Sequence, residues 1–361
     1  MEIMKIKDLC YFLPKSSIKA GEGSKEGRYP FFTSSDKQSL WIDKYLYDDE
    51  CLIIGTGGTA SCSYCNGKFA ASTDNFIIGS HNINVKYLYY FLRSNNLSIL
   101  QQGFHGAGLQ HISKDYFGNI DVIVPKKEEQ NRVVKVLDEI TLSITEDSKT
   151  LEQLNELVKS KFNEMFSADI LSNKRACKFS DICTSYIGLT YKPENVSSEG
   201  TIVLRSGNIQ NGELYLEDDV VRVNNITIKD DKIVKPLDII MCARNGSARL
   251  VGKTCIIKRV DEKMSFGAFM AVIKTKYPYI INSFMNSDYF RSQLVSTQTA
   301  SVNQITTRML YSYDVFEPTI DEEVRFRQFV IAVDETKEAI KARISLVKEL
   351  LNKKMNAFFE N

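Results

Sequence analysis

The chain has 361 residues, 43% hydrophobic and 25% charged, which is the composition of a globular protein with room for two domains. Its 46 Lys and Arg residues against 45 Asp and Glu residues exclude an overall basic field, so any affinity for nucleic acid must come from local patches. The eight scattered cysteines, and the lack of an apolar spanning segment or a secretory start, predict a soluble cytoplasmic protein with free thiols.

The first segment, residues 1–125, is predicted to form a domain of mixed α and β structure. Runs rich in β-branched residues at 51–54 and 76–79 indicate strands, and residues 87–93 carry apolar side chains at helical spacing. We therefore expect a sheet with at least one helix packed on it.

A glycine-rich stretch and a cysteine pair in this domain resemble known sites only in part. Gly55-x-Gly57-Gly58 follows a predicted strand, but the helix pattern and acidic residue of a dinucleotide site do not follow it. We expect a loop whose glycines allow close approach to DNA or adopt positive φ angles. Cys62-x-x-Cys65 has no second ligand pair, which favours buried thiols over a zinc site.

Two histidines, His105 and His111, flank a Gly-Ala-Gly turn. No nucleophile or carboxylate partner accompanies them in a recognisable motif, so catalysis is not indicated. The segment 109–113 aligns with 302–306 at an offset of 193 residues, which sets His111 beside Gln304. A catalytic histidine would not be matched by glutamine, whereas a polar loop could use either residue, on a plain surface or against DNA.

A motif at the end of the first domain recurs 193 residues later. Pro125-x-x-Glu-Glu-Gln-x-Arg132 corresponds to Pro318-x-x-Asp-Glu-Glu-x-Arg325. Proline followed by acidic residues marks a helix start, because carboxylates favour the positive end of the helix dipole. Long helices are therefore predicted at 126–167 and 319–361, each of them about 60 Å long at 1.5 Å per residue.

Both predicted helices carry apolar residues in alternating steps of four and three, as a coiled-coil seam does. One apolar stripe alone more often packs on the core of its own domain, but two narrow stripes in matching register favour an intramolecular antiparallel coiled coil. Polar residues interrupt the seam at Asp147 and Lys161 in the first helix and at Lys337 and Lys354 in the second. The predicted seam consists of Val133, Leu137, Ile140, Ile144, Leu151, Leu154 and Val158, with Phe326, Val330, Val333, Ile340, Ile344, Val347 and Leu351.

The segment 168–318 is predicted to form a second domain of the same kind. It contains a predicted strand at 239–242 and apolar residues at helical spacing in 279–290. Residues 50–60 and 238–248 each combine an acidic residue, a strand and a glycine-containing loop, which indicates one fold used twice. The predicted fold class is α+β, with two similar globular domains alternating with two long helices that form an antiparallel coiled coil.

This whole-chain order resembles the DNA specificity subunit of type I restriction-modification systems. The resemblance covers essentially all 361 residues, and its most specific parts are the repeated Pro-x-x motif, residues 238–246, and residues 29–32 ahead of 47–50. It implies that each globular domain is a target-recognition domain for one half of a bipartite DNA site. It also implies that the helices act as a spacer and bind two methyltransferase subunits.

The sequence contains no motif that would make the chain itself an enzyme. A Walker loop, the Asn/Asp-Pro-Pro-Tyr/Phe site of adenine methylation and a carboxylate-and-lysine nuclease core are all missing. By resemblance, the chain needs no cofactor or metal, while partner subunits would use S-adenosylmethionine, ATP and magnesium, with motor-nuclease subunits present when DNA is cut. The alternative is a coiled-coil adaptor or scaffold whose globular domains bind other ligands.

Candidate DNA contacts follow from residue chemistry, since Arg suits guanine, Asn and Gln suit adenine, and Lys, Ser and Thr hold phosphates. Solvated surface turns explain the same loops equally well. The second domain has 19 Lys and Arg against 16 Asp and Glu, a net +3, and the first has 12 against 12, so tight binding would need partner subunits. The candidates are Lys15, Lys19, Lys25, Arg28, Thr56, Gly57, Gly58, Thr59, Ser61 and His111 in the first domain, and Arg205, Asn208, Arg244, Asn245, Ser247, Arg249 and Gln304 in the second.

Overall fold

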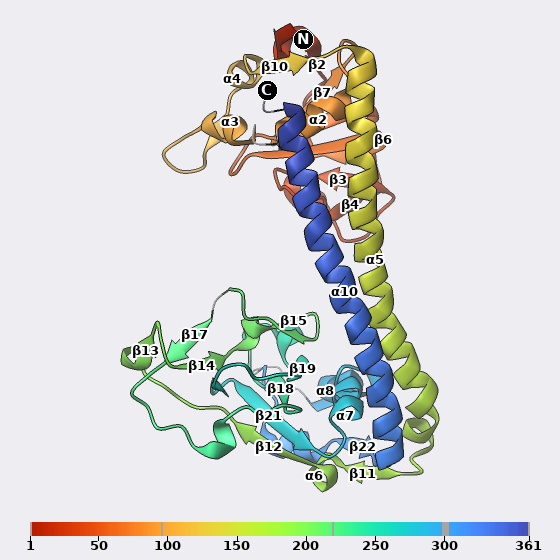
Figure 1. The fold of residues 1–361 in the computed structure, drawn as a ribbon, viewed down its shortest axis with the longest axis vertical. Helices are drawn as coiled ribbons and strands as arrows, with labels where there is room; N and C mark the ends of the chain where they lie inside the picture. Colours follow the sequence, from red (N-terminus) through yellow and green to blue (C-terminus); the bar gives the residue numbers. More distant parts are fainter. Residues whose placement is uncertain (1, 95–96, 219, 298–302, 360–361) are drawn as a thin grey trace. The chain divides into compact units, whose positions relative to one another are not determined.

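The computed structural model describes residues 2–94, 97–218, 220–297 and 303–359 (Figure 1). Val302, which opens the aligned segment 302–306, lies outside them. The chain divides into two compact units, and each unit holds one globular domain together with part of both long helices. The first unit is Met1–Lys149 with Ile340–Asn361, and the second is Thr150–Ala339.

The first domain is built on a six-stranded sheet in the order β2-β7-β5-β6-β3-β4. All neighbours are antiparallel except β3 and β6, which are parallel. The strands of this sheet are β2 (Cys10–Phe12), β3 (Tyr29–Phe32), β4 (Leu40–Ile42), β5 (Tyr47–Gly55), β6 (Ser61–Ala71) and β7 (Asn75–Ser80). Two short pairs complete the domain: β1 (Glu2–Lys5) with β10 (Asp121–Val124), and β8 (Phe104–His105) with β9 (His111–Ile112).

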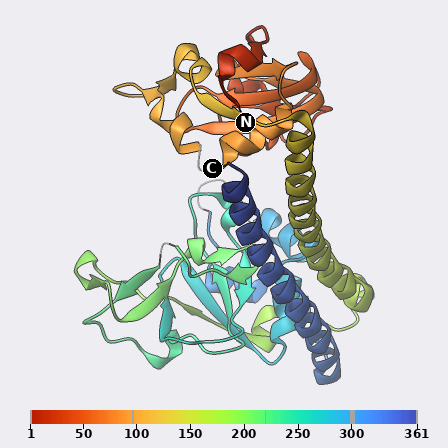
Figure 2. The same ribbon diagram turned by 45° about the horizontal axis from the view of Figure 1, so that its top comes forward.

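The helices of this domain are α1 (Ile6–Leu9), α2 (Val85–Arg93), α3 (Leu97–Gln102) and α4 (Lys114–Gly118). Figures 1 and 2 show α2 beside the sheet, where its apolar residues join the same buried cluster as Leu52 and Ile54 of β5. The helix begins at Asn84, whose side chain accepts hydrogen bonds from the backbone N–H groups of Lys86 and Tyr87. Residues 51–54 of β5 are buried on both faces of the sheet, which explains why this part of the strand is a continuous apolar run.

The second domain contains two four-stranded sheets. The first has the order β12-β21-β18-β19, and the second has the order β13-β17-β14-β20. The strands of the first sheet are β12 (Cys183–Ile187), β18 (Ile239–Cys242), β19 (Thr254–Ile256) and β21 (Met270–Thr275). Those of the second are β13 (Val196–Ser197), β14 (Thr201–Leu204), β17 (Val221–Val223) and β20 (Met264–Phe266). Two further pairs are β11 (Ala176–Lys178) with β22 (Asp314–Phe316), and β15 (Ile209–Gln210) with β16 (Glu213–Leu214).

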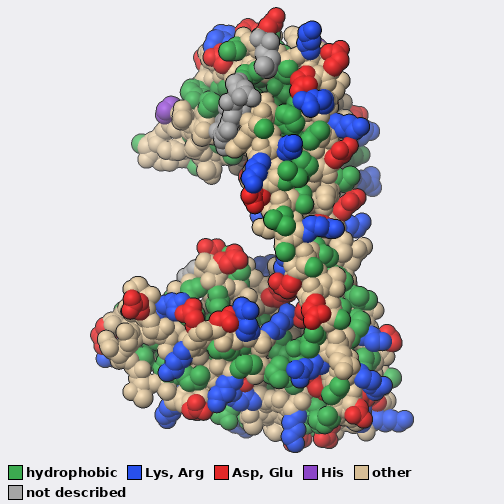
Figure 3. Space-filling view, in the orientation of Figure 1, with side chains coloured by type: hydrophobic (Ala, Val, Ile, Leu, Met, Phe, Trp, Pro, Cys, Tyr) green, Lys and Arg blue, Asp and Glu red, His purple; other side chains and the backbone are tan. Residues whose placement is uncertain are grey.

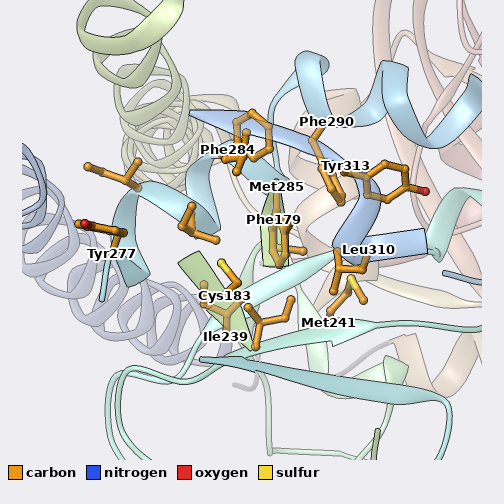
Figure 4. Close-up of a cluster of buried hydrophobic side chains, with 14 of the residues drawn as sticks. Phe179, Cys183, Ile239, Met241, Tyr277, Phe284, Met285, Phe290, Leu310 and Tyr313 are labelled. Carbon is orange, nitrogen blue, oxygen red and sulfur yellow. The ribbon is translucent and has the colours of Figure 1, made fainter. Parts of the chain in front are cut away.

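Helices cover one face of the β12-β21-β18-β19 sheet and close the main core of the second unit. They are α6 (Phe179–Ile182), α7 (Pro278–Met285), α8 (Asp288–Thr297) and α9 (Thr307–Ser312). Figure 4 shows Phe284 and Phe290 from α7 and α8 on the same side as Ile239 and Met241 of β18. Burying such large side chains contributes roughly 1.5–3 kcal/mol each, so this cluster is a main source of stability.

The two domains share one scaffold, which confirms the predicted α+β class with a repeated domain. The order β2-β7-β5-β6 in the first matches β12-β21-β18-β19 in the second, and the pair β1–β10 matches β11–β22. An ion pair recurs across the terminal strands, Lys5 with Asp121 in the first domain and Lys178 with Asp314 in the second. Because β1 pairs with β10 and β11 pairs with β22, the first and last strands of each domain are hydrogen-bonded to each other.

The long helices are α5 (Lys127–Ser172) and α10 (Ile320–Phe359), and they pair in antiparallel fashion within each unit. In the first unit, Asp147 of α5 forms an ion pair with Arg343 of α10. In the second, the ring of Phe162 lies 6.0 Å from that of Phe326, measured between centroids. Every side chain of the predicted seam is buried or half-buried. Outside it, Phe162 and Phe166 are also buried, whereas Leu142 and Leu157 are exposed.

Two of the polar interruptions of the seam, Asp147 and Lys337, have partners of their own. The Asp147 side chain is 3% exposed, and its two carboxylate oxygens accept hydrogen bonds from Nε and Nη2 of Arg343, which is 62% exposed. Lys337 is buried in the second unit, 3.6 Å from the carboxylate of Asp334, and Asp334 also binds Lys258. A buried charge is costly unless it is paired, so both sites constrain the register of the helices.

The repeated Pro-x-x motif joins each long helix to its domain. Oε1 of Gln130 accepts a hydrogen bond from the backbone N–H of Asn84, and its Nε2 donates to the carbonyl of Pro125. At the equivalent place, the Glu323 carboxylate accepts from the N–H groups of Tyr279 and Ile280 at 3.0 and 3.1 Å. Burial raises the pKa of Glu323 above its usual value, although the two hydrogen bonds oppose the shift.

Within the described ranges, no helix combines the length and the apolar character that crossing a membrane requires.

Candidate nucleic-acid interface

The glycine loop of the first domain follows β5 and is hydrogen-bonded to the segment before α4. The N–H of Ile112 donates to the carbonyl of Thr56 at 3.2 Å, and the N–H of Gly58 donates to the carbonyl of Gln110 at 2.9 Å. Between these bonds, Gly57 and His111 form an isolated antiparallel bridge. Gly58 has a φ of +87°, a conformation that favours glycine.

The same arrangement recurs after β18 in the second domain. The N–H of Ile305 donates to the carbonyl of Ala243 at 2.7 Å, and the N–H of Asn245 donates to the carbonyl of Asn303 at 3.2 Å. Arg244 and Gln304 form the corresponding bridge. Arg244 thus takes the place of Gly57, and Gln304 takes the place of His111.

A concave pocket adjoins this bridge in the second domain. It has a volume of about 910 Å³ and is lined by five separate stretches of chain. The guanidinium of Arg244 lies 5.3 Å from the ring centroid of Phe269, a cation–π contact. The lining stretches are residues 189–191, 205–207, 244–246, 267–270 and 303.

Three of the predicted DNA contacts line this pocket: Arg205, Arg244 and Asn245. Asn208 lies close to them in sequence but is buried, and its side chain accepts from the N–H of Arg205 and donates to the carbonyl of Tyr215. The amide of Asn208 therefore holds the turn together. Its prediction as a DNA contact remains a prediction.

The remaining candidates of the second domain surround the bridge. Ser247 and Arg249 are exposed in the turn after Arg244, and Gln304 is half-buried opposite Arg244. Sequence reasoning missed two aromatic residues of the pocket, Tyr191 and Phe269. Phe269 is 59% exposed, and an aromatic residue directly after Gly267-Ala268, between two strands, was the available signal.

The candidates of the first domain divide into two groups. Thr56, Gly57, Gly58 and Thr59 form the glycine loop, and Thr59 is its exposed member. Ser61, by contrast, is 3% exposed inside β6, where little of it reaches the surface. The second group lies on the segment between β2 and β3 and is exposed; it comprises Lys15, Lys19, Lys25 and Arg28.

Positive and negative side chains are mixed on one face of the molecule. On the face shown in Figure 3, Lys and Arg side chains alternate with Asp and Glu over both domains, without one large basic area. This agrees with the balanced composition of the chain.

The cysteine pair of β6 has the geometry of structural thiols. Cys62 and Cys65 are three residues apart on one strand, so their side chains point to opposite faces of the sheet. Burial raises the pKa of the Cys62 thiol to about 12. Among the residues whose placement is described, no group of three or more His, Cys, Asp or Glu side chains is arranged to hold a metal ion.

Residues 1–156 match the family described as the type I restriction modification DNA specificity domain. The chain is 27% identical over 147 residues to the type I restriction enzyme EcoDI specificity subunit of Escherichia coli, which covers 41% of the chain and 33% of that protein. It is 20% identical over 389 residues to the type I restriction enzyme MjaVIII specificity subunit of Methanocaldococcus jannaschii, and this alignment covers 98% of the chain and 91% of that protein. The alignment with the first of these relatives thus spans only a third of its length.

Solved structures show the same fold. The type I restriction-modification S subunit from M. genitalium superposes with a TM-score of 0.58 at 14% identity, covering 99% of this chain and 96% of that one. A chain from a study of complex assembly and conformational transition in a type I R-M system gives a TM-score of 0.55 at 14% identity. The superposition covers 99% of this chain and 97% of that one.

Proposed function

Because the chain belongs to the specificity subunits of type I restriction-modification systems, we propose that it recognises a bipartite DNA sequence, one block with each globular domain. The observation that carries this proposal is the equivalence of the two loop–strand bridges, Gly57–His111 and Arg244–Gln304, on a shared scaffold. Two similar scaffolds with different side chains at one position suit two half-sites of different sequence. The adaptor hypothesis has no support from the comparisons.

In this proposal the chain recognises DNA and its partners perform the chemistry. Two methyltransferase subunits would bind the chain, and motor-nuclease subunits would join when DNA is cut. S-adenosylmethionine, ATP and magnesium would be bound by those subunits. The balanced charge of the chain supports this division, because counterion release scales with the number of phosphates neutralised and partner subunits would add to it.

The test is sequencing of methylated adenines in DNA from cells that express the chain with its neighbouring methyltransferase. A second strain carries residues 176–316, from β11 to β22, exchanged for another target-recognition domain. We expect two short blocks separated by unspecified bases, of which only one block changes on exchange. Unmethylated DNA, or a motif that survives the exchange, would contradict the proposal.

A further inference from the structure

We propose that Arg244 and His111, on opposite sides of two equivalent bridges, are specificity-determining residues. Arg244 recognises a guanine in the second half-site, and His111 accepts a hydrogen bond from a base amino group in the first. This inference rests on the proposed function and assigns the chemistry of two of its contacts. The geometry of the two bridges and the surroundings of each side chain carry it.

The backbone at Arg244 is rigidly held while its side chain is exposed. The N–H groups of Ala243 and Arg244 both donate to the carbonyl of Phe269, at 2.9 and 3.0 Å. The guanidinium rests over the Phe269 ring, and no ion pair joins it to a carboxylate of the described residues. Arg222, by contrast, is bound to Glu262 at 2.6 Å. Arg244 therefore presents its donors without first breaking an ion pair.

Two amides near Arg244, those of Asn245 and Asn303, are engaged within the loop. Nδ2 of Asn245 donates to Oγ of Ser206 at 3.1 Å, and its Oδ1 accepts from the N–H of Ser247 at 3.0 Å. Nδ2 of Asn303 donates to the carbonyl of Gly246 at 3.0 Å. Bidentate recognition of adenine needs a free amide, whereas a guanidinium matches O6 and N7 of guanine. Gln304, across the bridge from Arg244, is half-buried, whereas the side chain of Arg244 is exposed. Arg244 is therefore the more accessible donor at this bridge, which favours guanine.

In the first domain, the side chain that is available at the bridge belongs to His111, the residue equivalent to Gln304, and not to Gly57, the residue equivalent to Arg244. Gly57 has none, and a Cβ built there would lie 3.3 Å from Cε1 of His111. Nδ1 of His111 lies 3.1 Å from the carbonyl oxygen of Thr56. Because that oxygen can only accept, this contact calls for a hydrogen on Nδ1, and in that tautomer Nε2 is the acceptor. Such an acceptor suits N6 of adenine or N4 of cytosine.

The first experiment compares four modification complexes: wild type, Arg244→Ala, Arg244→Lys and Arg259→Ala. Arg259 is an exposed arginine of the same domain whose partner is Asp261, so it controls for loss of one positive charge. Methylated sites are sequenced, and complexes are titrated with duplexes that carry each base at each position of the second block. We expect Arg244→Ala to lose its preference for guanine at one position, by about 10- to 100-fold, with the first block unchanged.

Arg244→Lys should keep part of the affinity but lose most of the discrimination, because an ammonium is a point donor without the fork of a guanidinium. Arg259→Ala should keep the wild-type motif. If the Arg244→Ala complex still distinguishes the four bases at every position of the second block as the wild type does, the assignment is wrong. The duplex titration measures this even if the variant no longer methylates DNA. A wild-type complex without a bipartite motif would instead contradict the proposed function itself.

The second experiment replaces His111 by Ala and by Gln, the residue at the equivalent position 304. His111→Ala should relax the first block at one position where adenine or cytosine is preferred, and leave the second block intact. His111→Gln should retain a preference, because its side-chain oxygen can also accept. An unchanged first block in His111→Ala would remove His111 from the proposal.

Discussion

The two domains differ most at the far edge of the shared four-stranded scaffold. In the first, β3 and β4 extend the same sheet beyond β6. In the second, a separate sheet of β13, β17, β14 and β20 stands beside the shared one, and β15 pairs with β16 alone. The scaffold strands and the docking of the long helices are equivalent in both. The strands that lie closest to the long helices are thus preserved, whereas the strands at the far edge of the scaffold differ between the domains.

The strongest test of this equivalence uses two matched core positions, Phe326 and Val133, which are 193 residues apart. Both side chains are buried where a long helix meets its domain, at 0% and 3% exposure. Phe326→Ala should lower the free energy of unfolding of the second unit by about 3–5 kcal/mol, and Val133→Ala should lower that of the first by about 2 kcal/mol.

The single tryptophan, Trp41, lies in β4 of the first domain, so its fluorescence reports the first unit while circular dichroism reports both. In urea titrations, Val133→Ala should shift the fluorescence transition, and Phe326→Ala should shift only a part of the dichroism transition. Coincident shifts of both signals in Phe326→Ala would mean that the two units unfold together and would break the comparison.

The polar pair in the seam of the first unit gives the next largest effect. Arg343→Ala should cost about 2–3 kcal/mol, because it leaves the buried Asp147 carboxylate unpaired. Asp147→Ala should cost less, since the exposed Arg343 can be hydrated. The double variant Asp147→Ile with Arg343→Thr copies the residues found 193 positions away, Ile340 and Thr150, and should restore stability. Thermal unfolding of the three variants checks this order, and equal losses from the two single variants would contradict it.

The smallest expected effect concerns Glu323, whose counterpart is Gln130. Because burial raises its pKa in the folded state, the fold binds the proton more tightly than the unfolded chain does. The stability of the second unit should therefore fall as the pH rises through this raised pKa. Glu323→Gln should remove that dependence and change the free energy of unfolding by less than about 1 kcal/mol. Hydrogen exchange of the α7 amides at several pH values measures it, and an unchanged pH dependence in the variant would exclude Glu323 as its source.

The sequence predicted the features that depend on periodicity and repetition. Both long helices were predictable because an apolar seam needs a regular spacing, and the repeated proline motif marked where each helix begins. The repeat also aligned His111 with Gln304, and these two residues occupy equivalent positions in the two bridges of the structure. Such features are visible in sequence because each follows from local spacing.

The pocket could not be predicted in the same way, because five separate stretches of chain form it. No spacing in the sequence predicts that the ring of Phe269 contacts the guanidinium of Arg244. None predicts that the side-chain amide of Asn208 donates a hydrogen bond to the carbonyl of Tyr215. The burial of Ser61 was missed for a related reason: the loop ends at Ala60, and where β6 begins depends on its pairing with β5. Tertiary hydrogen bonds decide which polar side chains remain available.

The pairing of β1 with β10, and of β11 with β22, places the two ends of each globular domain side by side. A segment of chain bounded by such strands can be replaced by another of different length without altering the path of the helices that follow. Because the repeat unit of 193 residues also contains a whole helix, recombination between its two copies would keep the heptad phase. Under the proposed function, the fold would therefore allow a lineage to acquire a new combination of half-sites through the exchange of coding segments, with no accumulated point mutations.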